Sequence, residues 1–509
     1  MFKFRKKEKK VEEEKPKEGL SLKAKKTPLS IRIALAFCVV LFLAVTIYIL
    51  KILLDMQILP TKYLAIIIVV LISLVAIGVL LFFFSKRHII PAIVASILYT
   101  LLSVAIIFGA GYLTRTQTFF KNTTARDYYV ANYSVLVLND APYRRLEDVD
   151  GKRIATYIDA VPSYSEAFEE IKKIIQPETV IKDTYYDAAV ALKNKEVDFI
   201  LLSDSYVSMM NDTIEDFSNT VRSIADFEIK IYDVVEVHDV DVLSEPFNIF
   251  LSGIDTKGAI SNVSRSDVNM ILTINPKNHK VLLTSIPRDY YVQLHGTAGI
   301  KDKLTHSGIY GPKMTVKTVE ELLGIRINYF VRVNFSSLIN LVNSIGGIYF
   351  TPDITISHNQ DGVWCHYNKN VRAWYNGHCA LRYVRERKAY ADGDLHRIQN
   401  QQLVLGAIMD KLMSAEIIKN YSSILSAIEG NFETSVPEQK IYQLINNQLD
   451  TMPKWNVENY HLSGTDSYSN IYSSEMSGTG NNGSSYYVME PDMATVEAAK
   501  AKIDALFEE

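Results

Sequence analysis

Three stretches near the start of the chain contain no charged residue, and they constrain the fold more than any other feature: Ile33–Leu50, Tyr63–Ser85 and Ile89–Thr114. A helix needs about 20 apolar residues to cross a hydrocarbon layer about 30 Å thick. The first stretch begins late, lacks a small-residue cleavage site and is followed by two more, which argues against a cleaved signal peptide. We therefore predict three transmembrane helices within residues 31–114.

Positive charge around these stretches sets the expected orientation. Residues 1–30 carry 11 Lys and Arg against 5 Asp and Glu, and the loop between the second and third stretches is Lys86-Arg87-His88. Basic segments resist translocation and stay in the cytoplasm. We therefore predict a multi-pass cell membrane protein with a basic cytoplasmic tail at residues 1–30. Everything after Thr114 is expected outside the cell.

The charge of the exported part excludes one broad class of partner. With +6 in residues 1–30 and +4 in residues 31–114, the chain total of −3 leaves −13 for the remainder. A part this acidic repels polyphosphate chains, so no nucleic acid partner is expected. Any anion bound outside must be held locally, by a metal ion and a dense cluster of arginines.

The exported part is predicted to contain two α/β domains, a small accessory domain at residues 128–233 and a larger domain at residues 246–509. In the first, the segments LEDVDGKRIATY and AAVALKNKEVDFILL resemble one lobe of the type 2 periplasmic solute-binding fold. A spacer domain without a ligand is the alternative. In the second, Ser463–Ser485 is rich in Gly, Ser, Asn and Tyr and is predicted to be a long mobile loop. Pro491–Leu506 is a predicted terminal helix.

Three apolar, β-branched segments open the larger domain: Phe247–Ile254, Val268–Ile274 and Lys280–Ile286. A Gly/Ser/Asn-rich loop and the turn at residues 275–278 separate them, as is typical of antiparallel hairpins. In such a meander the end of the first strand, the start of the second and the end of the third share one edge. The charged residues expected at that edge are Asp255, Arg265, Asp267, Arg288 and Asp289.

This edge has the composition of a site for a metal-bound pyrophosphate. Asp255 and Asp267 stand at the base of one hairpin, where two carboxylates repel each other unless a cation or a proton lies between them. Carboxylate oxygens suit Mg²⁺, and clustered guanidinium groups suit phosphate oxygens. Two simpler explanations stay open: the aspartates cap turns, and Arg288 forms a surface salt bridge with Asp289.

A second group of arginines lies in YVRERKAYADGDLHRIQNQQ, from Tyr383 to Gln402. The overlapping ALRYV looks like a strand, whose continuation would point Arg385 and Arg387 to one face, where they can bind phosphoryl groups together. Asp392-Gly393 is expected to open a helix. One polar stripe of that helix consists of Asp394, Arg397 and Gln401. A solvated helix face is the simpler explanation of the stripe taken alone, but three such patterns coincide in this domain.

Two cysteines lie in the exported part. Oxidising conditions outside the cell permit a disulfide between Cys365 and Cys379, which would stabilise the fold by about 3 kcal/mol. Free thiols are one alternative, and a zinc site with His366 and His378 is another.

The apolar pattern of residues 329–350 predicts a strand, a helix and a second strand. Ordinary core packing explains this pattern. A tunnel for a lipid tail is the alternative, because a domain tethered to the membrane meets lipid substrates.

The segments NIFLSGID, SRSDVNMILTI, LLTSIPRDYYV, INYFVRVNF, LINLVNSIGGI and LRYVRERKAYADGDLHRIQNQQ together resemble the LytR-CpsA-Psr domain over about Pro246–Leu506. The three apolar stretches and the extra exported domain resemble its capsule-locus CpsA branch. The resemblance implies an α/β domain with a mixed central sheet. It also implies an enzyme that moves a glycopolymer from an undecaprenyl-pyrophosphate carrier to peptidoglycan, or hydrolyses the pyrophosphate when no acceptor is present.

Matched motif by motif, the resemblance assigns roles to individual residues. Asp255 and Asp267 would hold Mg²⁺, and Gln401 would hydrogen-bond the pyrophosphate or the lipid phosphate. Asp394 would orient the arginines or act near the acceptor. The residues expected to act in catalysis are Arg288, Arg385, Arg387 and Asp394. The residues expected to grip the pyrophosphate are Arg265, Arg288, Arg385, Arg387, Arg397 and Gln401.

Two positions depart from the family pattern: Thr256-Lys257, which can alter the sugar side of the pocket, and Asn400, which replaces a cation of the usual cluster. We predict a Mg²⁺-dependent, membrane-anchored phosphotransferase whose polymer is a capsular polysaccharide. Peptidoglycan, membrane lipid and capsule assembly proteins are the expected partners. The alternatives are a membrane sensor or transcriptional attenuator of capsule expression, and a simple pyrophosphate phosphatase.

Overall fold

The computed structural model divides into two compact units. One unit contains the three long N-terminal helices, and the other contains the chain from Thr114 onward together with Met56–Pro60. The accessory domain and the larger α/β domain therefore lie in the same unit. The structure describes residues 27–86, 88–123, 128–157, 162–214, 216–232, 235–254, 259–360, 362–390, 394–412, 414, 424, 426–427, 429–475 and 486–508.

The anchor unit consists of α1 (Leu29–Met56), α2 (Thr61–Phe84) and α3 (Ile89–Thr123). Each helix is long and apolar enough to cross a membrane, as predicted. Gly78 allows α2 to approach α3 closely, because a Cβ at this position would lie 2.9 Å from the ring of Tyr99. Helix α3 continues nine residues past the predicted end of the third span at Thr114, to Thr123.

The accessory domain is a five-stranded sheet with helices, in agreement with the predicted α/β class. The strand order is β3-β2-β4-β1-β5, with β2 parallel to β3 and β4 and with β1 antiparallel to β4 and β5. The strands are β1 (Tyr129–Leu138), β2 (Arg153–Thr156), β3 (Glu178–Ile181), β4 (Phe199–Ser203) and β5 (Val221–Ile231). The helices are η1 (Leu146–Val149), α4 (Pro162–Lys172), α5 (Tyr185–Lys193), α6 (Asp204–Thr213) and α7 (Phe217–Thr220).

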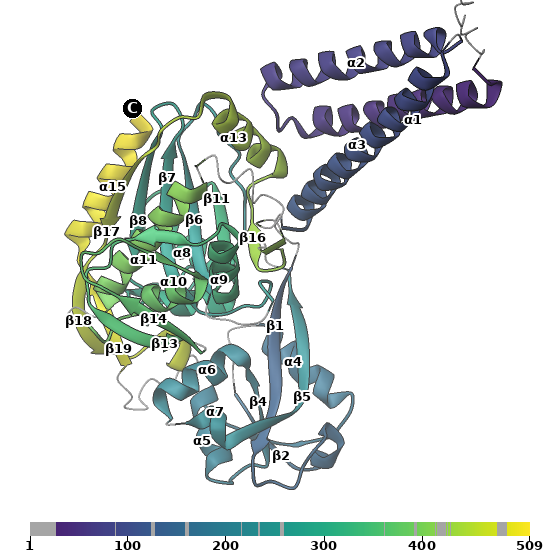
Figure 1. The fold of residues 1–509 in the computed structure, drawn as a ribbon. Helices are drawn as coiled ribbons and strands as arrows, with labels where there is room; N and C mark the ends of the chain where they lie inside the picture. The colour runs from purple at the N-terminus through teal and green to yellow at the C-terminus, as the bar shows by residue number, and fades with distance from the viewer. Residues whose placement is uncertain are drawn as a thin grey trace, which may run out of the picture. The chain divides into compact units, whose positions relative to one another are not determined.

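The larger domain is built on a six-stranded mixed sheet in the order β16-β11-β6-β7-β8-β17 (Figure 1). The predicted meander is confirmed, because β6, β7 and β8 are antiparallel neighbours. β11 pairs in parallel with β6, and β17 pairs in parallel with β8. The strands are β6 (Phe247–Ile254), β7 (Ser266–Asn275), β8 (Lys280–Ile286), β11 (Tyr329–Asn334), β16 (Phe432–Thr434) and β17 (Asn456–His461).

Helices cover both faces of this sheet. Successive residues of a strand point to opposite faces, and on β8 Leu283 packs in one cluster with Leu405, whereas Leu282 packs with Ile503. Leu405 lies on α11 and Ile503 on α15, so these two helices lie on opposite faces. The helices are η2 (Leu304–Tyr310), α8 (Pro312–Leu323), α9 (Phe335–Ser344), α10 (Gly377–Val384), α11 (Asp394–Leu412), α13 (Glu438–Thr451), α14 (Tyr472–Glu475) and α15 (Met493–Glu508).

Four pairs of short strands complete the domain, and one of them corrects a prediction. The segment Ser463–Ser485 was predicted to be a mobile loop, but its first part forms β18 and α14. Pairing with a distant strand, β19, gives this polar segment its structure, and residues 476–485 lie outside the described residues. The pairs are β9 (Tyr291–Val292) with β10 (Asp302–Lys303), β12 (Ile348–Phe350) with β15 (Ala373–Tyr375), β13 (Ile356–Gln360) with β14 (Val363–Tyr367), and β18 (Gly464–Ser469) with β19 (Tyr486–Pro491).

The predicted strand ALRYV is wrong, because these residues form the helix α10. The side chain of Asn376 accepts a hydrogen bond from the backbone N–H of Cys379 at 2.9 Å and caps the helix. An N-cap asparagine of this kind favours a helix over the strand that the β-branched and aromatic residues suggest. The predicted disulfide is confirmed, and it joins Cys365 on β14 to Cys379 on α10.

Candidate active site

One end of the central sheet gathers segments from four strands. Ile254, the last residue of β6, pairs with Ser266 at the start of β7 and with Asn334 at the end of β11. Ile286, the last residue of β8, pairs with Asn269 on β7. The segments that follow β6 and β8 and precede β7 therefore meet at one edge, as the meander predicts.

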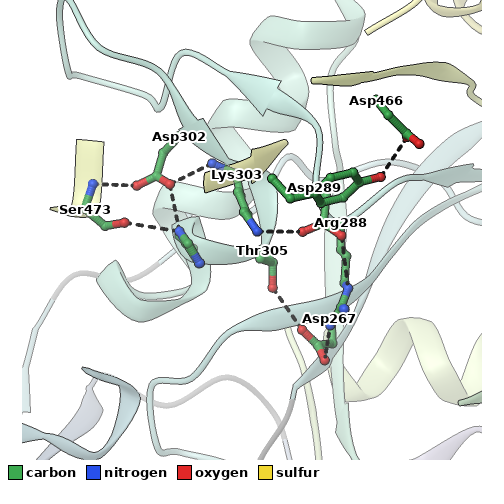
Figure 2. A network of polar contacts seen from close by, with 10 residues as sticks. Asp267, Arg288, Asp289, Asp302, Lys303, Thr305, Asp466 and Ser473 are labelled. Atoms are coloured by element: carbon green, nitrogen blue, oxygen red, sulfur yellow. Dashed lines mark hydrogen bonds and ion pairs between the residues drawn. The ribbon is translucent and has the colours of Figure 1, made fainter. Parts of the chain in front are cut away.

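Asp267 is the centre of a charged cluster at this edge. Its side chain is 6% exposed, and its Oδ2 accepts a hydrogen bond from Nη1 of Arg288 at 3.0 Å. Nη2 of Arg397, on α11, lies 3.7 Å from the same oxygen and donates to the backbone carbonyl of Asp267 at 3.3 Å. Figure 2 shows the side chain of Arg288 directed toward Asp267. Two predicted arginines thus contact one predicted aspartate.

The surroundings keep Asp267 ionised. Burial has the largest single effect and by itself would raise the pKa of this carboxyl, whereas the positive charges of Arg288 and Arg397 are the strongest of the influences that lower it. The charge of Arg265 and a hydrogen bond from Thr305 lower the pKa of Asp267 further, so that it lies well below the ordinary value of 3.8. A carboxylate stabilised in this way stays negative at neutral pH.

Thr305 is a partner of Asp267 that the sequence analysis missed. Its Oγ1 donates to Oδ1 of Asp267 at 3.0 Å, and its backbone N–H donates to the carbonyl of Arg288 at 2.8 Å. Gly308 allows η2 to lie this close to the start of β7, because a Cβ there would be 2.3 Å from the carbonyl oxygen of Ser264. No local motif signals this contact, since it depends on how η2 packs against the sheet.

Arg288 also belongs to a second set of ion pairs, formed with Asp289 and Lys303 (Figure 2). The carboxylate of Asp289 is 3.5 Å from Nε of Arg288 and 3.2 Å from Nζ of Lys303. Lys303 also lies over the ring of Tyr487, with Nζ 5.7 Å from the ring centroid. The salt bridge between Arg288 and Asp289 is thus present together with the contact to Asp267, but the two side chains are only 17% and 9% exposed, so it is not the surface salt bridge of the simpler explanation.

The buried carboxylate of Asp302 connects this region to the C-terminal segment. Asp302 accepts hydrogen bonds from the backbone N–H groups of Lys303 and Ser473, each at 2.7 Å. It also lies 2.7 Å from Nδ1 of His306, and the hydroxyl of Ser473 is 3.1 Å from that same nitrogen. Because Asp302, His306 and Ser473 are all buried, this network holds α14 against η2.

Arg385 and Arg387 lie in an exposed loop that follows α10. The guanidinium carbon of Arg385 is 4.4 Å from the ring centroid of Phe335, which directly follows β11. Arg385 therefore lies at the sheet end that carries the charged cluster. Between the two arginines, the buried Glu386 accepts hydrogen bonds from the backbone N–H groups of Arg387 and Ala389, each at 3.1 Å. A buried carboxylate thus shapes the loop that presents both arginines.

The structure describes two of the remaining predicted site residues, Asp255 and Asp394, only in part or not at all. Asp255 lies outside the described residues, as does the side chain of Asp394, whose backbone begins α11. Gln401 is half-buried on the same helix, one turn after Arg397. Asn400 is buried, and its Nδ2 donates to the carbonyl of Tyr383 at 3.3 Å. This contact links α11 to the end of α10.

The charged cluster offers one of the ligands that a divalent cation needs. Asp267 supplies an ionised carboxylate, which is the type of ligand that Mg²⁺ prefers, but its two oxygens already bind Arg288 and Thr305. Within the described ranges, no group of three His, Cys, Asp or Glu residues could hold a metal ion. Mg²⁺ takes few protein ligands beside phosphate and water oxygens. The pair Asp255 and Asp267 therefore stays a prediction for this ion.

Comparisons with known proteins place these features in a family. Residues 207–502 match the model of the LytR_cpsA_psr family. A polyisoprenyl-teichoic acid–peptidoglycan teichoic acid transferase, TagU of Bacillus cereus (strain AH820), is 33% identical over 222 residues, which cover 43% of this chain and 70% of the relative. TagU of Enterococcus faecalis (strain ATCC 700802 / V583) is 36% identical over 196 residues, covering 38% and 62%.

Solved structures are also similar. The crystal structure of B. subtilis TagV is 29% identical, covers 52% of this chain and 98% of that chain, and has a TM-score of 0.41. The structure described as TagT bound to LI-WTA is 27% identical, covers 54% and 95%, and has a TM-score of 0.41.

The fold and the site define a mixed α/β domain with a buried cluster of arginine and aspartate side chains, on a chain with three helices that are long and apolar enough to cross a membrane. The match to the family model and the identity to TagU together assign it: this chain belongs to the LytR-CpsA-Psr family.

Proposed function

We propose that this protein transfers a glycopolymer from a polyprenyl-pyrophosphate carrier to peptidoglycan. The names of its relatives support this proposal, because TagU is a transferase of teichoic acid from a polyisoprenyl carrier to peptidoglycan. The single observation that carries it is Asp267, which is ionised, buried and in contact with Arg288 and Arg397 at one end of the sheet. Such a cluster can bind a diphosphate and stabilise charge that develops on it.

In the proposed reaction, a hydroxyl oxygen of the acceptor sugar attacks the phosphorus that carries the glycopolymer. A new P–O bond forms, the P–O bond to the bridging oxygen breaks, polyprenyl phosphate leaves, and the hydroxyl proton is released to solvent. Negative charge grows on the departing phosphate. Arg288 and Arg397 stabilise this charge from the sheet end, and Arg265 adds its charge from the start of β7.

The loop after α10 supplies further contacts. Arg385 and Arg387 are proposed to bind the phosphate oxygens, since the loop is exposed and Arg385 lies at the same sheet end. Gln401 is proposed to hydrogen-bond the diphosphate, and Asp394 to orient the arginines. Mg²⁺ held by Asp255 and Asp267 would neutralise phosphate charge when bound.

The anchor fits a substrate that resides in the membrane. With the N-terminal tail in the cytoplasm, the larger domain lies outside the cell beside the lipid carrier, which raises the local concentration of substrate. We propose a capsular polysaccharide as the polymer, because the three helices and the accessory domain resemble the CpsA branch. Hydrolysis of the diphosphate is proposed when water replaces the acceptor.

The test uses the full chain in detergent micelles with an undecaprenyl-pyrophosphate-linked oligosaccharide. With Mg²⁺ and peptidoglycan, we expect oligosaccharide bound covalently to peptidoglycan and release of undecaprenyl phosphate. With Mg²⁺ alone, we expect hydrolysis, and with EDTA, neither. If the purified protein turns over no lipid diphosphate under any of these conditions, the proposal that it is an enzyme fails, and the alternative that it is a membrane sensor is favoured.

A further inference from the structure

Arg332 is a charged residue in the interior of the central sheet, where charge is costly. It lies on β11 and is 2% exposed. Its strand partner Glu433 on β16 is 1% exposed, and Nη1 of Arg332 lies 3.3 Å from Oε2 of Glu433. Since apolar residues often replace a buried ion pair without loss of stability, the pair alone explains little about why an arginine stands here.

The guanidinium of Arg332 also contacts two other parts of the chain. Its Nη2 donates to the backbone carbonyl of Asn262 at 3.0 Å, and its Cζ lies 5.2 Å from the ring centroid of Tyr129. Asn262 belongs to the segment of residues 259–265 that leads into β7. Tyr129 is the first residue of β1 in the accessory domain. One buried cation therefore contacts the sheet, this segment and the accessory domain.

The backbone of the accessory domain binds the same segment. The N–H of Val130 donates to the carbonyl of Ser261 at 2.9 Å, and the N–H of Val263 donates to the carbonyl of Val130 at 2.9 Å. These bonds form a parallel β-bridge between Val130 and Asn262. The hydroxyl of Ser205, on α6, donates to the carbonyl of Val263 at 3.3 Å. The accessory domain thus holds the segment from two of its elements.

We propose that the accessory domain fixes the segment of residues 259–265 and so sets the position of Arg265 and Asp267, with Arg332 as the positioning residue of this link. The segment contains neither a helix nor a full strand of its own, so external hydrogen bonds must order it. Two backbone bonds, the hydroxyl of Ser205 and one charged donor provide that order. The accessory domain acts here as a structural part of the site, through contacts that it makes beside Arg265.

The test replaces both members of the buried pair, because removal of one charge alone would leave the other unpaired. The variant Arg332→Met/Glu433→Met is studied as the full chain in detergent micelles. Hydrogen exchange of the Val130 and Val263 amides should become about tenfold faster, since a charged donor beside them is lost. The melting temperature should change little. If Arg332 and Glu433 contributed only to the stability of the sheet, these two amides would exchange as slowly as in the wild type.

The kinetic part of the test rests on the proposed function. The KM for the lipid-linked oligosaccharide should rise about tenfold, with a smaller change in kcat, because a displaced Arg265 binds the diphosphate less well. Tyr129→Leu removes only the aromatic contact and should raise both the exchange rates and the KM by a smaller factor. It also keeps the test decisive if the double variant fails to fold. Arg153→Met, in an exposed ion pair of the accessory domain with Asp198, is the control and should match the wild type.

Wild-type exchange rates at Val130 and Val263 in both variants would overturn the proposal. Faster exchange with an unchanged KM would overturn the claim that the segment positions Arg265. If the wild-type protein turns over no lipid diphosphate, the transferase proposal fails, whereas the exchange measurement still decides whether Arg332 holds the segment.

Discussion

Arg288 and Asp267 are separated by 21 positions in the chain, yet Nη1 of one donates to Oδ2 of the other at 3.0 Å. The antiparallel pairing of β7 with β8 brings them together, because the aspartate lies at the start of one strand and the arginine follows the end of the other. The side chain of Arg288 is 17% exposed, so its charge is already held in place before a ligand binds. Charged groups that need not reorganise stabilise a transition state most effectively.

Replacing Arg288 by alanine should abolish most of the turnover. Loss of one preorganised charge typically lowers kcat by a factor of about 10² to 10³. Release of polyprenyl phosphate by the purified full chain measures this loss. Arg144→Ala, at an exposed position of the accessory domain, is the control and should retain wild-type turnover. Equal rates for Arg288→Ala and the wild type would remove Arg288 from the site.

Replacing Thr305 by valine should weaken the fold at the site. The variant keeps the shape of the side chain but removes the hydroxyl that donates to Oδ1 of Asp267. The free energy of unfolding should fall by about 1 kcal/mol or somewhat more, as measured by urea denaturation of the full chain. Thr305→Ser keeps the donor and should lose less. If both variants have the same free energy of unfolding, the hydroxyl of residue 305 contributes nothing to stability.

Replacing Asp302 by alanine should have a larger effect on stability than most substitutions. It leaves the backbone N–H groups of Lys303 and Ser473 without their buried acceptor and removes one of the two polar partners of His306 Nδ1. Each such group costs roughly 1–3 kcal/mol, so the melting temperature should fall by several degrees. Asp466→Ala, where one exposed hydrogen bond to a tyrosine is lost, is the control and should be nearly neutral.

Asp267 should make the stability of the larger domain depend on pH in acid. Its pKa in the folded chain is lower than in the unfolded chain. Its contribution to the free energy of unfolding is therefore complete above about pH 4 and is lost as the pH falls further. Urea denaturation between pH 2 and pH 7, in about one-unit steps, should show this loss in the wild type and less of it in Asp267→Asn. Identical pH profiles would contradict the assignment.

The sequence predicts much of the sheet and part of the site. β6 and β8 have the predicted bounds and β7 lies within two residues of them, because β-branched runs between turn residues are a strong local signal. Antiparallel pairing then places Asp267 beside Arg288 without any tertiary information. Arg397 could be predicted to lie on a helix, but its contact with Asp267 depends on how α11 crosses the sheet.

The incorrect and missed predictions arise where local sequence does not determine the structure. α10 is short, and one capping side chain, that of Asn376, outweighs a composition that favours a strand. β18 is polar and gains its structure only from β19, which lies beyond it in the chain. Thr305 and Arg332 carry no local signal at all. Their roles follow from contacts between segments that are distant in sequence.

The disulfide bond between Cys365 and Cys379 makes part of the fold depend on the redox conditions in which the chain folds. It fastens β14 to α10, and the loop with Arg385 and Arg387 begins where α10 ends. In a compartment rich in reducing thiols this disulfide would not form, and the base of the loop would be held by the Asn376 cap, by the hydrogen bonds of Glu386 and Asn400, and by apolar contacts. The redox conditions during folding thus affect how rigidly the loop that contains Arg385 and Arg387 is held.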